Sequence, residues 1–464
     1  MLGGGPAGCA AALRLAQLGR RVVLVERGGP ARAHGVETLA PTAAPLLASL
    51  GASAALAAAR PLPSPCLHWP GVPVAGGAEG VDAVAPAWMA AAGWHVERAP
   101  FDAEMRRAAQ AAGVTLWHDH AGPARPLGQG WQVPLRSGRV LEAQAVIDAR
   151  GRRATRPESA ARTAVLVARL RGGAPAEATA GWPSHVEAFD TGWVWAVAAA
   201  PGEVLACCFM DAAGLARRAG RPAQAAALLA RAPALAQRLR GAALVAVHTG
   251  DATPRAADDP APARGWFGAG DAAFTIDPLS AQGTVAAMRS GVQAAVCVHT
   301  TLGEPTHEAL AREFHRQQCR RVRHWHVRAA AALQAPARAA WDTPFWRGRG
   351  TESPRLYRPA PVPPGAALRI VRAAALRDLE APALDGECIV ARPAVMHPHW
   401  DGPVAWLAGQ PVHDWLDGAP RQGPGMPAAD LHGTWRARHG AARAEAAWHW
   451  LWTAGAIVAA GADG

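Results

Sequence analysis

The sequence of 464 residues contains no lysine, so its Lys+Arg count of 47 is entirely arginine. A chain without lysine has no Walker-type phosphate-binding lysine, no Schiff base with pyridoxal phosphate and no lysine nucleophile. Charged residues make up only 18% of the chain and form no dense basic run, so the net charge of +11 does not indicate nucleic-acid binding. Abundant alanine, arginine, glycine and proline are typical of GC-rich coding, which explains the charge better.

The chain also lacks a disulfide pattern and a long apolar run. Its seven cysteines are odd in number and form no C-x-x-C pair. A reducing compartment, the cytoplasm, therefore fits best. The most apolar stretch, residues 446–460, is too short to span a bilayer and is interrupted by His449. We expect a core helix there, packed by Trp448, Trp450 and Trp452.

The histidines do not form a metal-binding pattern. Three His-x-His pairs occur, and His315 has helical spacing to Cys319, but no acidic cluster accompanies them. On a helix, the two-residue spacing of His324 and His326 points the rings apart. We therefore predict no metal site, and the G-x-S-x-G and H-E-x-x-H motifs of hydrolases are missing too.

What is present begins with a glycine motif. Residues 3–8 read G-G-G-P-A-G and match G-x-G-x-x-G. Gly3 permits the tight turn out of a strand, Gly5 lets backbone N–H groups approach a pyrophosphate, and Gly8 lets the next helix pack closely. The motif predicts a dinucleotide site, the alternative being a glycine-rich turn without a ligand.

The residues after the motif strengthen the dinucleotide interpretation. Residues 10–17 are rich in alanine and leucine and predict a helix, and residues 21–26 predict a buried strand. Its terminal acid, Glu26, has about the spacing expected of a ribose-binding carboxylate. Only Met1 and Leu2 precede the motif, so we expect either that the start of the chain lies further upstream or that the first strand is truncated. A strand this short would lose central ladder bonds, so we expect a version extended by one N-terminal strand to fold and hold its cofactor better.

Two later segments offer partners for the motif. Residues 93–102 predict a strand that leads into a helix capped by Asp102. Arg98 at this junction is suited to bidentate phosphate binding, an arginine on a solvated face being the alternative. Residues 265–273 predict a strand that ends in Asp271, followed by a long helix over 284–300 whose unpaired N–H groups suit the electron-rich edge of a flavin.

Between these segments the pattern changes to short strands. Turn residues separate apolar runs that predict an antiparallel sheet inserted between two halves of the nucleotide domain. Trp193 and Trp195 would face the same side of it, either as core or as an aromatic wall for a substrate. The runs are residues 164–170, 185–189, 192–198 and 203–210.

Taken in order over about residues 1–335, these elements resemble the FAD-dependent monooxygenases of the glutathione-reductase-type fold, which include flavin-dependent halogenases. Residues 35–39 and the Pro-Leu-Ser-x-Gln-Gly run at 278–283 are most similar to the halogenase-like branch with flavoprotein maturases of quinone-cofactor amine dehydrogenases and amino-acid oxidases. Those maturases hydroxylate a tryptophan of a partner polypeptide.

The resemblance implies an α/β fold with a Rossmann-type FAD-binding domain, an inserted antiparallel β-sheet substrate domain and a smaller mixed C-terminal region. The boundaries that we expect are an FAD-binding domain over 1–350, made of about 1–60, 95–163 and 255–350, a substrate domain of about 61–94 and 164–254, and a C-terminal region over 365–464 after a Pro-rich linker at 353–364.

It also implies FAD as the cofactor, with NAD(P)H or a separate flavin reductase as the electron source. Glu37, His68 and Trp195 are candidates to line the catalytic site, without assigned roles. The cofactor-binding residues that the resemblance implies are Gly3, Gly5, Pro6, Ala7, Gly8, Glu26, Arg27, Arg98, Gly270, Asp271, Pro278, Gln282, Gly283 and Thr284.

The implied activity is hydroxylation of an aromatic group, an indole or a peptide-bound tryptophan, through a flavin C4a-hydroperoxide. Halogenation is disfavoured because halogenases of this branch guide hypohalous acid with a lysine. Their W-x-W-x-I-P motif is also half present, with Val197 and Ala198 in place of Ile-Pro. A flavin-dependent reductase or dehydrogenase, a halogenase-like enzyme of natural-product metabolism and a non-catalytic partner protein remain alternatives. No nucleic acid or membrane partner is expected.

Overall fold

The computed structural model describes most of the chain. The Pro-rich linker expected at 353–364 lies outside the described residues. So does most of residues 61–92, a Pro- and Gly-rich region without periodicity that predicts loops or short strands. The described residues are 1–28, 35–62, 66–71, 93–152, 155–157, 161–172, 182, 184–350, 365 and 367–461.

A parallel sheet carries the glycine motif, and Leu2 lies between its two halves. The Leu2 N–H donates to the Ile147 carbonyl at 3.0 Å, and the Leu2 carbonyl accepts from Ala149 N–H at 2.8 Å. On the other side, Gly3 N–H donates to the Val25 carbonyl at 2.8 Å. Leu2 and Gly3 thus make ladder bonds that we expected a truncated strand to lose. The order is β6 (Thr115–His118), β1 (Val23–Glu26), Leu2, β10 (Val146–Asp148) and β18 (Trp266–Gly268).

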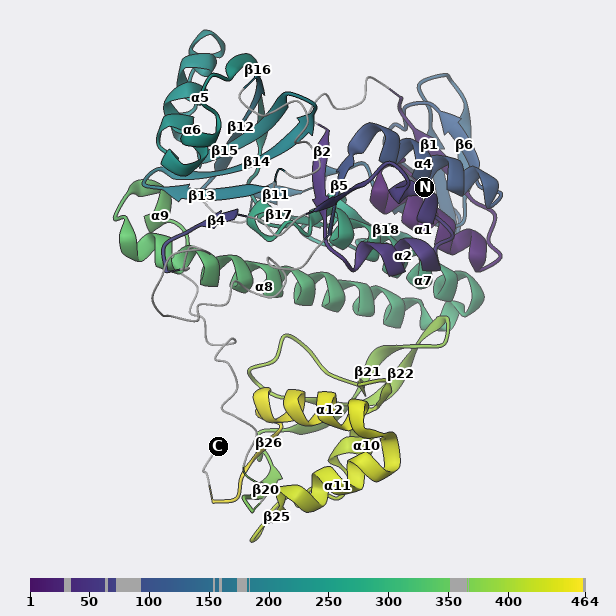
Figure 1. Ribbon diagram of the computed structural model, residues 1–464. Helices are drawn as coiled ribbons and strands as arrows, with labels where there is room; N and C mark the ends of the chain where they lie inside the picture. Colours follow the sequence, from purple (N-terminus) through teal and green to yellow (C-terminus); the bar gives the residue numbers. More distant parts are fainter. Residues whose placement is uncertain are drawn as a thin grey trace.

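Two helices cross beside this sheet at very short range. A Cβ added at Gly291 would lie 2.1 Å from the Ala7 carbonyl oxygen, so the crossing requires glycine. The alanine-rich face that follows the motif is buried, which confirms the helix expected at 10–17. The helix expected at 284–300 is confirmed as well. These helices are α1 (Pro6–Gln17) and α7 (Gly283–Gly303), with α4 (Arg98–Ala111) packed against α1 (Figure 1).

The start of α4 corrects one expectation. Strand β5 (Gly93–Glu97) passes directly into the helix, and Glu97 is the N-cap residue. The prediction that Asp102 caps this helix is therefore wrong. Because Asp102 lies one turn inside α4, its carboxylate pairs instead with Arg98, the first residue of the helix.

A sheet of six strands in the described part of the chain confirms the expected antiparallel segments. Strand β16, which follows the helices α5 (Arg221–Ala230) and α6 (Pro233–Arg238), was not predicted. Strand β4, which adds in parallel at the edge, lies in the region expected to form loops or short strands. The strand order is β16 (Ala243–Asp251), β12 (Thr163–Arg171), β15 (Glu203–Asp211), β14 (Gly192–Ala200), β13 (His185–Phe189) and β4 (Cys66–His68).

Alternation along these strands gives the sheet two different faces. On β12, Leu166 and Ala168 point to one face, where they pack with Leu228 and Leu229 of α5. The residue between them, Val167, belongs to a different core on the opposite face. One face of the sheet is therefore closed by helices, and the other is left for a ligand.

The long helix α8 (Glu308–Ala340) runs beneath both sheets, and the C-terminal region lies on its far side (Figure 1). The hairpin of β21 (Arg377–Asp385) and β22 (Cys388–Met396) reaches back to α7, where Ile389 N–H donates to Thr300 Oγ1 at 2.9 Å. Arg328, which lies on α8, donates from Nη1 to Asp401 Oδ1 of the C-terminal region at 2.9 Å. These contacts fix the C-terminal region to the rest of the protein.

The tryptophan-rich C-terminal stretch differs from its prediction in length. Helix α12 (Ala441–Thr453) ends before Gly455, whose φ of +70° turns the chain, and β26 (Ile457–Ala459) follows. Trp448 is buried in the core of this region, which also contains α10 (Val412–Leu416), α11 (Ala428–His439) and β20 (Arg369–Arg372). None of the helices among the described residues is long and apolar enough to cross a membrane.

Smaller sheets complete the frame. Residues 130–134 and 140–143 form a hairpin, with one further strand beside it. The strands of these sheets are β2 (Val36–Leu39), β5 and β3 (Arg60–Leu62); β7 (Arg125–Leu127), β8 (Gly130–Pro134) and β9 (Val140–Ala143); and β11 (Arg156–Pro157), β17 (Arg255–Ala256) and β19 (Phe274–Thr275). In the C-terminal region, β25 (Met426–Pro427) pairs with β20, and β23 (Trp406–Leu407) pairs with β24 (Gln410–Pro411).

Candidate active site

A cavity of about 1530 Å³ extends from the glycine motif to the open face of the six-stranded sheet. A single small ligand commonly fills a pocket of about 300–1,000 Å³. The cavity is therefore large enough for a dinucleotide and a second molecule at once.

The glycine motif forms one end of the cavity. A Cβ at Gly8 would lie 1.8 Å from the Gly3 carbonyl oxygen, so Gly8 is needed for close packing beneath the turn. A Cβ at Gly5 would meet no atom of the described residues within 4 Å, although Gly5 lines the cavity. Packing does not explain glycine at position 5, whereas the approach of a phosphate to the backbone does. The first-turn N–H groups of α1, which have no partner within the helix, face the same region.

Glu26, at the end of β1, lies against this turn. Its Oε2 accepts a hydrogen bond from Gly4 N–H at 2.5 Å, and both residues line the cavity. The carboxylate is only partly buried, so it is accessible to ribose hydroxyls at the position that the spacing predicted.

The cavity-facing side of α4 carries three charged residues at intervals of four. Arg98 donates to both oxygens of Asp102, from Nε at 3.1 Å and from Nη2 at 3.0 Å. One turn further on, Arg106 Nη1 donates to the Gly4 carbonyl at 3.0 Å and so holds the glycine turn. Arg106 was missed in the sequence, although its i, i+4 spacing from Asp102 was visible.

Glu37 connects this helix with the start of α7. Its Oε1 accepts from Arg98 Nη1 at 2.6 Å, and its Oε2 accepts from Thr284 Oγ1. Burial lowers the pKa of Arg98, but the charges of Glu37 and Asp102 outweigh it and the pKa lies above its ordinary value. Arg98 is therefore a charged, fixed part of the wall rather than an arginine on a solvated face.

The chain entering α7 lines the next part of the cavity. Ala281 has a φ of +51°, the left-handed region, within the segment that the resemblance places beside the flavin ring. Strained backbone of this kind costs about 1–3 kcal/mol and concentrates at ligand sites. Pro278, Gly283 and Thr284 line the cavity on either side of it.

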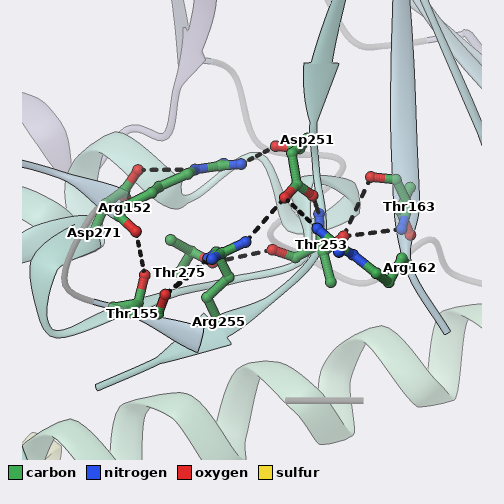
Figure 2. A network of polar contacts seen from close by, with 9 residues as sticks. All are labelled: Arg152, Thr155, Arg162, Thr163, Asp251, Thr253, Arg255, Asp271 and Thr275. Atoms are coloured by element: carbon green, nitrogen blue, oxygen red, sulfur yellow. Dashed lines mark hydrogen bonds and ion pairs between the residues drawn. The ribbon is translucent and has the colours of Figure 1, made fainter. Parts of the chain in front are cut away.

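Asp271 approaches from the end of β18. Its side chain is 37% exposed in the cavity wall, and its Oδ2 accepts from Arg152 Nε at 3.3 Å (Figure 2). Gly270, just before it, leaves no room for a side chain, because a Cβ there would lie 2.7 Å from Ala7 Cβ. Asp271 thus lies between α1 and Arg152, which stands on the segment that leads from β10 to the six-stranded sheet.

The far end of the cavity is apolar. Trp193 is buried and its ring stacks on Phe209, with the centroids 3.9 Å apart and an angle of 12° between the planes. Trp195 is only partly buried, and both tryptophans line the cavity. Trp193 is thus part of the core, and Trp195 presents part of its ring to the cavity; that this ring forms a substrate wall stays a prediction. Val165, Val167, Val186, Ile276 and Leu279 complete the apolar wall.

Cys207 is the thiol in this wall. Burial and, secondarily, the charge of Glu37 raise its pKa to about 12. The thiol is therefore neutral at physiological pH and does not act as a nucleophile.

Most of the residues singled out in the sequence meet in this cavity, and three do not line it. His68 lies on β4, where its ring stacks on that of His185 with the centroids 4.9 Å apart, and it is not among the residues that line this cavity. Gly8 lies beneath the turn, and Gln282 is the N-cap of α7. Those that line the cavity are Gly3, Gly5, Pro6, Ala7, Glu26, Arg27, Glu37, Arg98, Trp195, Gly270, Asp271, Pro278, Gly283 and Thr284.

Comparison with known proteins agrees with this geometry. Residues 1–47 match the family described as FAD binding domain. A search of curated proteins by sequence finds no significant match.

Solved structures resemble the chain over three quarters or more of its length. One is the peptidyl tryptophan dihydroxylase QhpG, described as essential for tryptophylquinone cofactor biogenesis, with 25% identity, a TM-score of 0.70 and 97% of each chain covered. Another is the flavin-dependent halogenase CmlS, with 19% identity, a TM-score of 0.79, and coverage of 100% of this chain and 96% of that one. The myxobacterial chondrochloren halogenase CndH covers 75% of this chain and 84% of its own, with 22% identity and a TM-score of 0.63.

The match of residues 1–47, the cavity and the likeness to QhpG define the class, an FAD-dependent oxidoreductase of the monooxygenase type, and its fold is similar to that of the flavin-dependent halogenases. The residues present fit the cofactor. Gly5, the partly exposed Glu26 and the partly exposed Asp271 all line this one cavity, and they supply the backbone clearance and the carboxylates that suit a dinucleotide.

Proposed function

We propose that this chain hydroxylates an aromatic substrate with an indole ring, in its most specific form a tryptophan of a partner polypeptide. The observation that carries the proposal is the continuity of one cavity from the dinucleotide end to the wall that holds Trp195. The similarity to a peptidyl tryptophan dihydroxylase over 97% of both chains supports the choice of an indole.

The chemistry of the wall agrees with this substrate class. An indole needs apolar and aromatic surface for its ring, and the partly buried Trp195 with the surrounding valines offers it. The tryptophan ring is electron-rich, so no protein nucleophile is needed to activate it, and the neutral Cys207 thiol does not supply one. The protein contributes orientation and a water-poor space.

Bound reduced FAD would supply two electrons to molecular oxygen. One oxygen atom of O2 would then enter the ring C–H bond, and the other would leave as water. The residues that would hold the cofactor are the glycine turn, Glu26 and Asp271. Glu37 and Arg98 would order the wall where the cofactor end meets the apolar end. For the electrons we propose NAD(P)H or a separate reductase.

We also propose that the protein works in a reducing compartment such as the cytoplasm, because all seven cysteines are free thiols. The proposed domains are a discontinuous FAD-binding domain over 1–350, an inserted substrate domain of about 61–94 and 164–254, and a C-terminal region over 365–464.

The test begins with the purified chain and FAD. We expect tight, saturable FAD binding, and reduced flavin protein given oxygen and a tryptophan-containing peptide should yield a peptide with added oxygen. With isotope-labelled oxygen gas, mass spectrometry should show that this oxygen derives from the gas. The control without oxygen should give no product. A chain that binds no flavin would overturn the assignment.

The alternatives predict different outcomes of the same experiment. A reductase or dehydrogenase would change the redox state of its flavin with substrate in the absence of oxygen. A halogenase would require chloride or bromide and add it to the ring, although the absence of lysine disfavours this. A non-catalytic partner protein would retain a polypeptide without turnover in any flavin state.

A further inference from the structure

Two of the segments that connect the parallel sheet with the six-stranded sheet lie side by side. The chain leaves after β10 through β11 to reach β12, and it returns from the end of β16 through β17 to reach β18. The two crossings pair with each other, with Arg156 opposite Ala256 and Pro157 opposite Arg255, and β17 also pairs with β19. The relative position of the two sheets, and hence of the two ends of the cavity, depends on this junction.

A network of polar contacts binds the junction together (Figure 2). The Asp251 carboxylate, at the end of β16, accepts from Arg255 Nη1 at 3.0 Å, Arg162 Nη2 at 3.2 Å and Thr253 N–H at 2.9 Å. Burial opposes ionisation of this carboxylate, but these bonds outweigh it and lower its pKa. Arg255 also donates from Nη2 to the Thr155 carbonyl at 2.9 Å, which joins the outgoing crossing to the returning one.

Arg152 is the residue that connects this network with the cofactor end. Its Nε donates to Asp271 Oδ2 at 3.3 Å, and its Nη1 donates to the Asp251 backbone carbonyl. All three residues line the cavity. In Figure 2 the guanidinium of Arg152 extends from the side of Asp271 toward Asp251. One planar side chain thus contacts both the acid expected to bind the cofactor and the last residue of the substrate-side strand.

We propose that Arg152 is a positioning residue that holds Asp271 toward the cofactor and ties it to the end of β16, so that FAD binding and the placement of the substrate wall are coupled. The proposal rests on the proposed function, because Asp271 must bind FAD. It assigns to Arg152 an orienting role, with no direct contact with the reacting atoms.

The first test is FAD affinity. Arg152→Gln removes the charge and the bridge, and we expect FAD to bind about tenfold more weakly. Arg152→Lys keeps the charge but does not span both partners, so it should restore only part of the affinity. The matched control is Arg162→Gln, which contacts the same Asp251 but does not line the cavity, and its FAD affinity should stay within about twofold of wild type.

A double-mutant cycle shows whether Arg152 acts through Asp271. If it does, Arg152→Gln should have little further effect on FAD affinity once Asp271→Asn is present. The cycle compares variants that share the same junction, so a general loss of stability would appear as additive effects. Additive losses, or wild-type affinity in Arg152→Gln, would overturn the proposal.

The second test addresses the coupling itself. FAD should slow hydrogen exchange of the backbone amides at residues 251–255 in the wild-type protein, and this protection should be lost in Arg152→Gln even at saturating FAD. Equal protection in both proteins would contradict the coupling. If the wild-type chain binds no FAD, the proposed function fails and this inference fails with it. If it binds FAD and the variants behave like wild type, only the inference fails.

Discussion

The Arg98 guanidinium lies 2.6 Å from the carboxylate of Glu37, a residue 61 positions earlier in the chain. The same carboxylate accepts from Thr284, at the start of α7, and Arg98 also pairs with Asp102. Three elements that approach the cavity from different parts of the sequence are therefore joined by one acid. Glu37 orders the wall, and its oxygens are occupied by these partners.

We expect Glu37→Ala to weaken FAD binding about tenfold, because Arg98 and Thr284 lose their common partner and the start of α7 is released. Fluorescence titration of FAD measures the effect. The control is Glu97→Gln, an exposed acid that makes no side-chain cap bond at the start of α4 and should leave the affinity unchanged. Wild-type affinity in Glu37→Ala would show that the pair is not needed for the cofactor.

The two glycines of the motif should respond differently to alanine. Gly5→Ala meets no atom of the described residues and should change the free energy of unfolding of the flavin-free protein by less than about 0.5 kcal/mol, while FAD affinity falls about tenfold or more. Gly8→Ala forces a Cβ against the Gly3 carbonyl and should cost about 2–3 kcal/mol of stability even without flavin. Urea unfolding and FAD titration separate the two. Equal FAD affinity in Gly5→Ala would place the pyrophosphate elsewhere.

The two tryptophans of β14 should separate substrate binding from stability. Trp195→Ala should raise the KM for a tryptophan-containing peptide roughly tenfold and leave FAD affinity unchanged, because its ring faces the cavity. Trp193→Ala removes a buried ring stacked on Phe209 and should cost about 3–5 kcal/mol of stability. Trp195→Phe, which keeps an aromatic face, serves as the control. An unchanged KM in Trp195→Ala would exclude this wall from substrate binding.

Stability should fall as the solution becomes acidic, partly through His315. Burial lowers the pKa of this histidine to about 4, although its Nε2 lies 2.8 Å from the Gly268 carbonyl. The unfolded chain binds the proton at about 6.5, so the unfolded state gains protons first and stability is lost as the pH falls from about 6.5 toward 4.

For one such histidine the loss between pH 7 and pH 5 is about 2 kcal/mol. His315→Gln does not titrate, so the difference in unfolding free energy between the two pH values should shrink by that amount even if the variant is less stable at both. Urea unfolding at the two pH values measures it. The same difference in the variant as in wild type would show that His315 is protonated in the folded state.

The sequence by itself determined the local parts of this protein. The glycine turn, the helix after it and the acid at Glu26 follow from backbone clearance and periodicity within about thirty residues. Alternation likewise predicted strands β12 to β15 and placed Trp193 and Trp195 on one face. These features depend on neighbours in the chain, and the structure has them where they were expected.

Only the tertiary structure decided which side chains meet. Arg98 was recognised, but its partner Glu37 and the supporting Arg106 come together because β2, α4 and the glycine turn pack around one cavity. The Asp102 cap failed because β5 runs without a break into α4. His68 was chosen from a region without periodicity, and it lies on β4 at the edge of the six-stranded sheet.

The contact between Arg152 and Asp271 shows why the sequence did not predict which side chains meet. The two residues are 119 positions apart, and neither has a spacing or a motif that predicts the other. Their contact exists because two segments that connect the two sheets, β11 and β17, pair with each other. Local sequence determines how each strand and helix forms, but long-range packing determines which charges share a cavity wall, and that packing sets the geometry of the site.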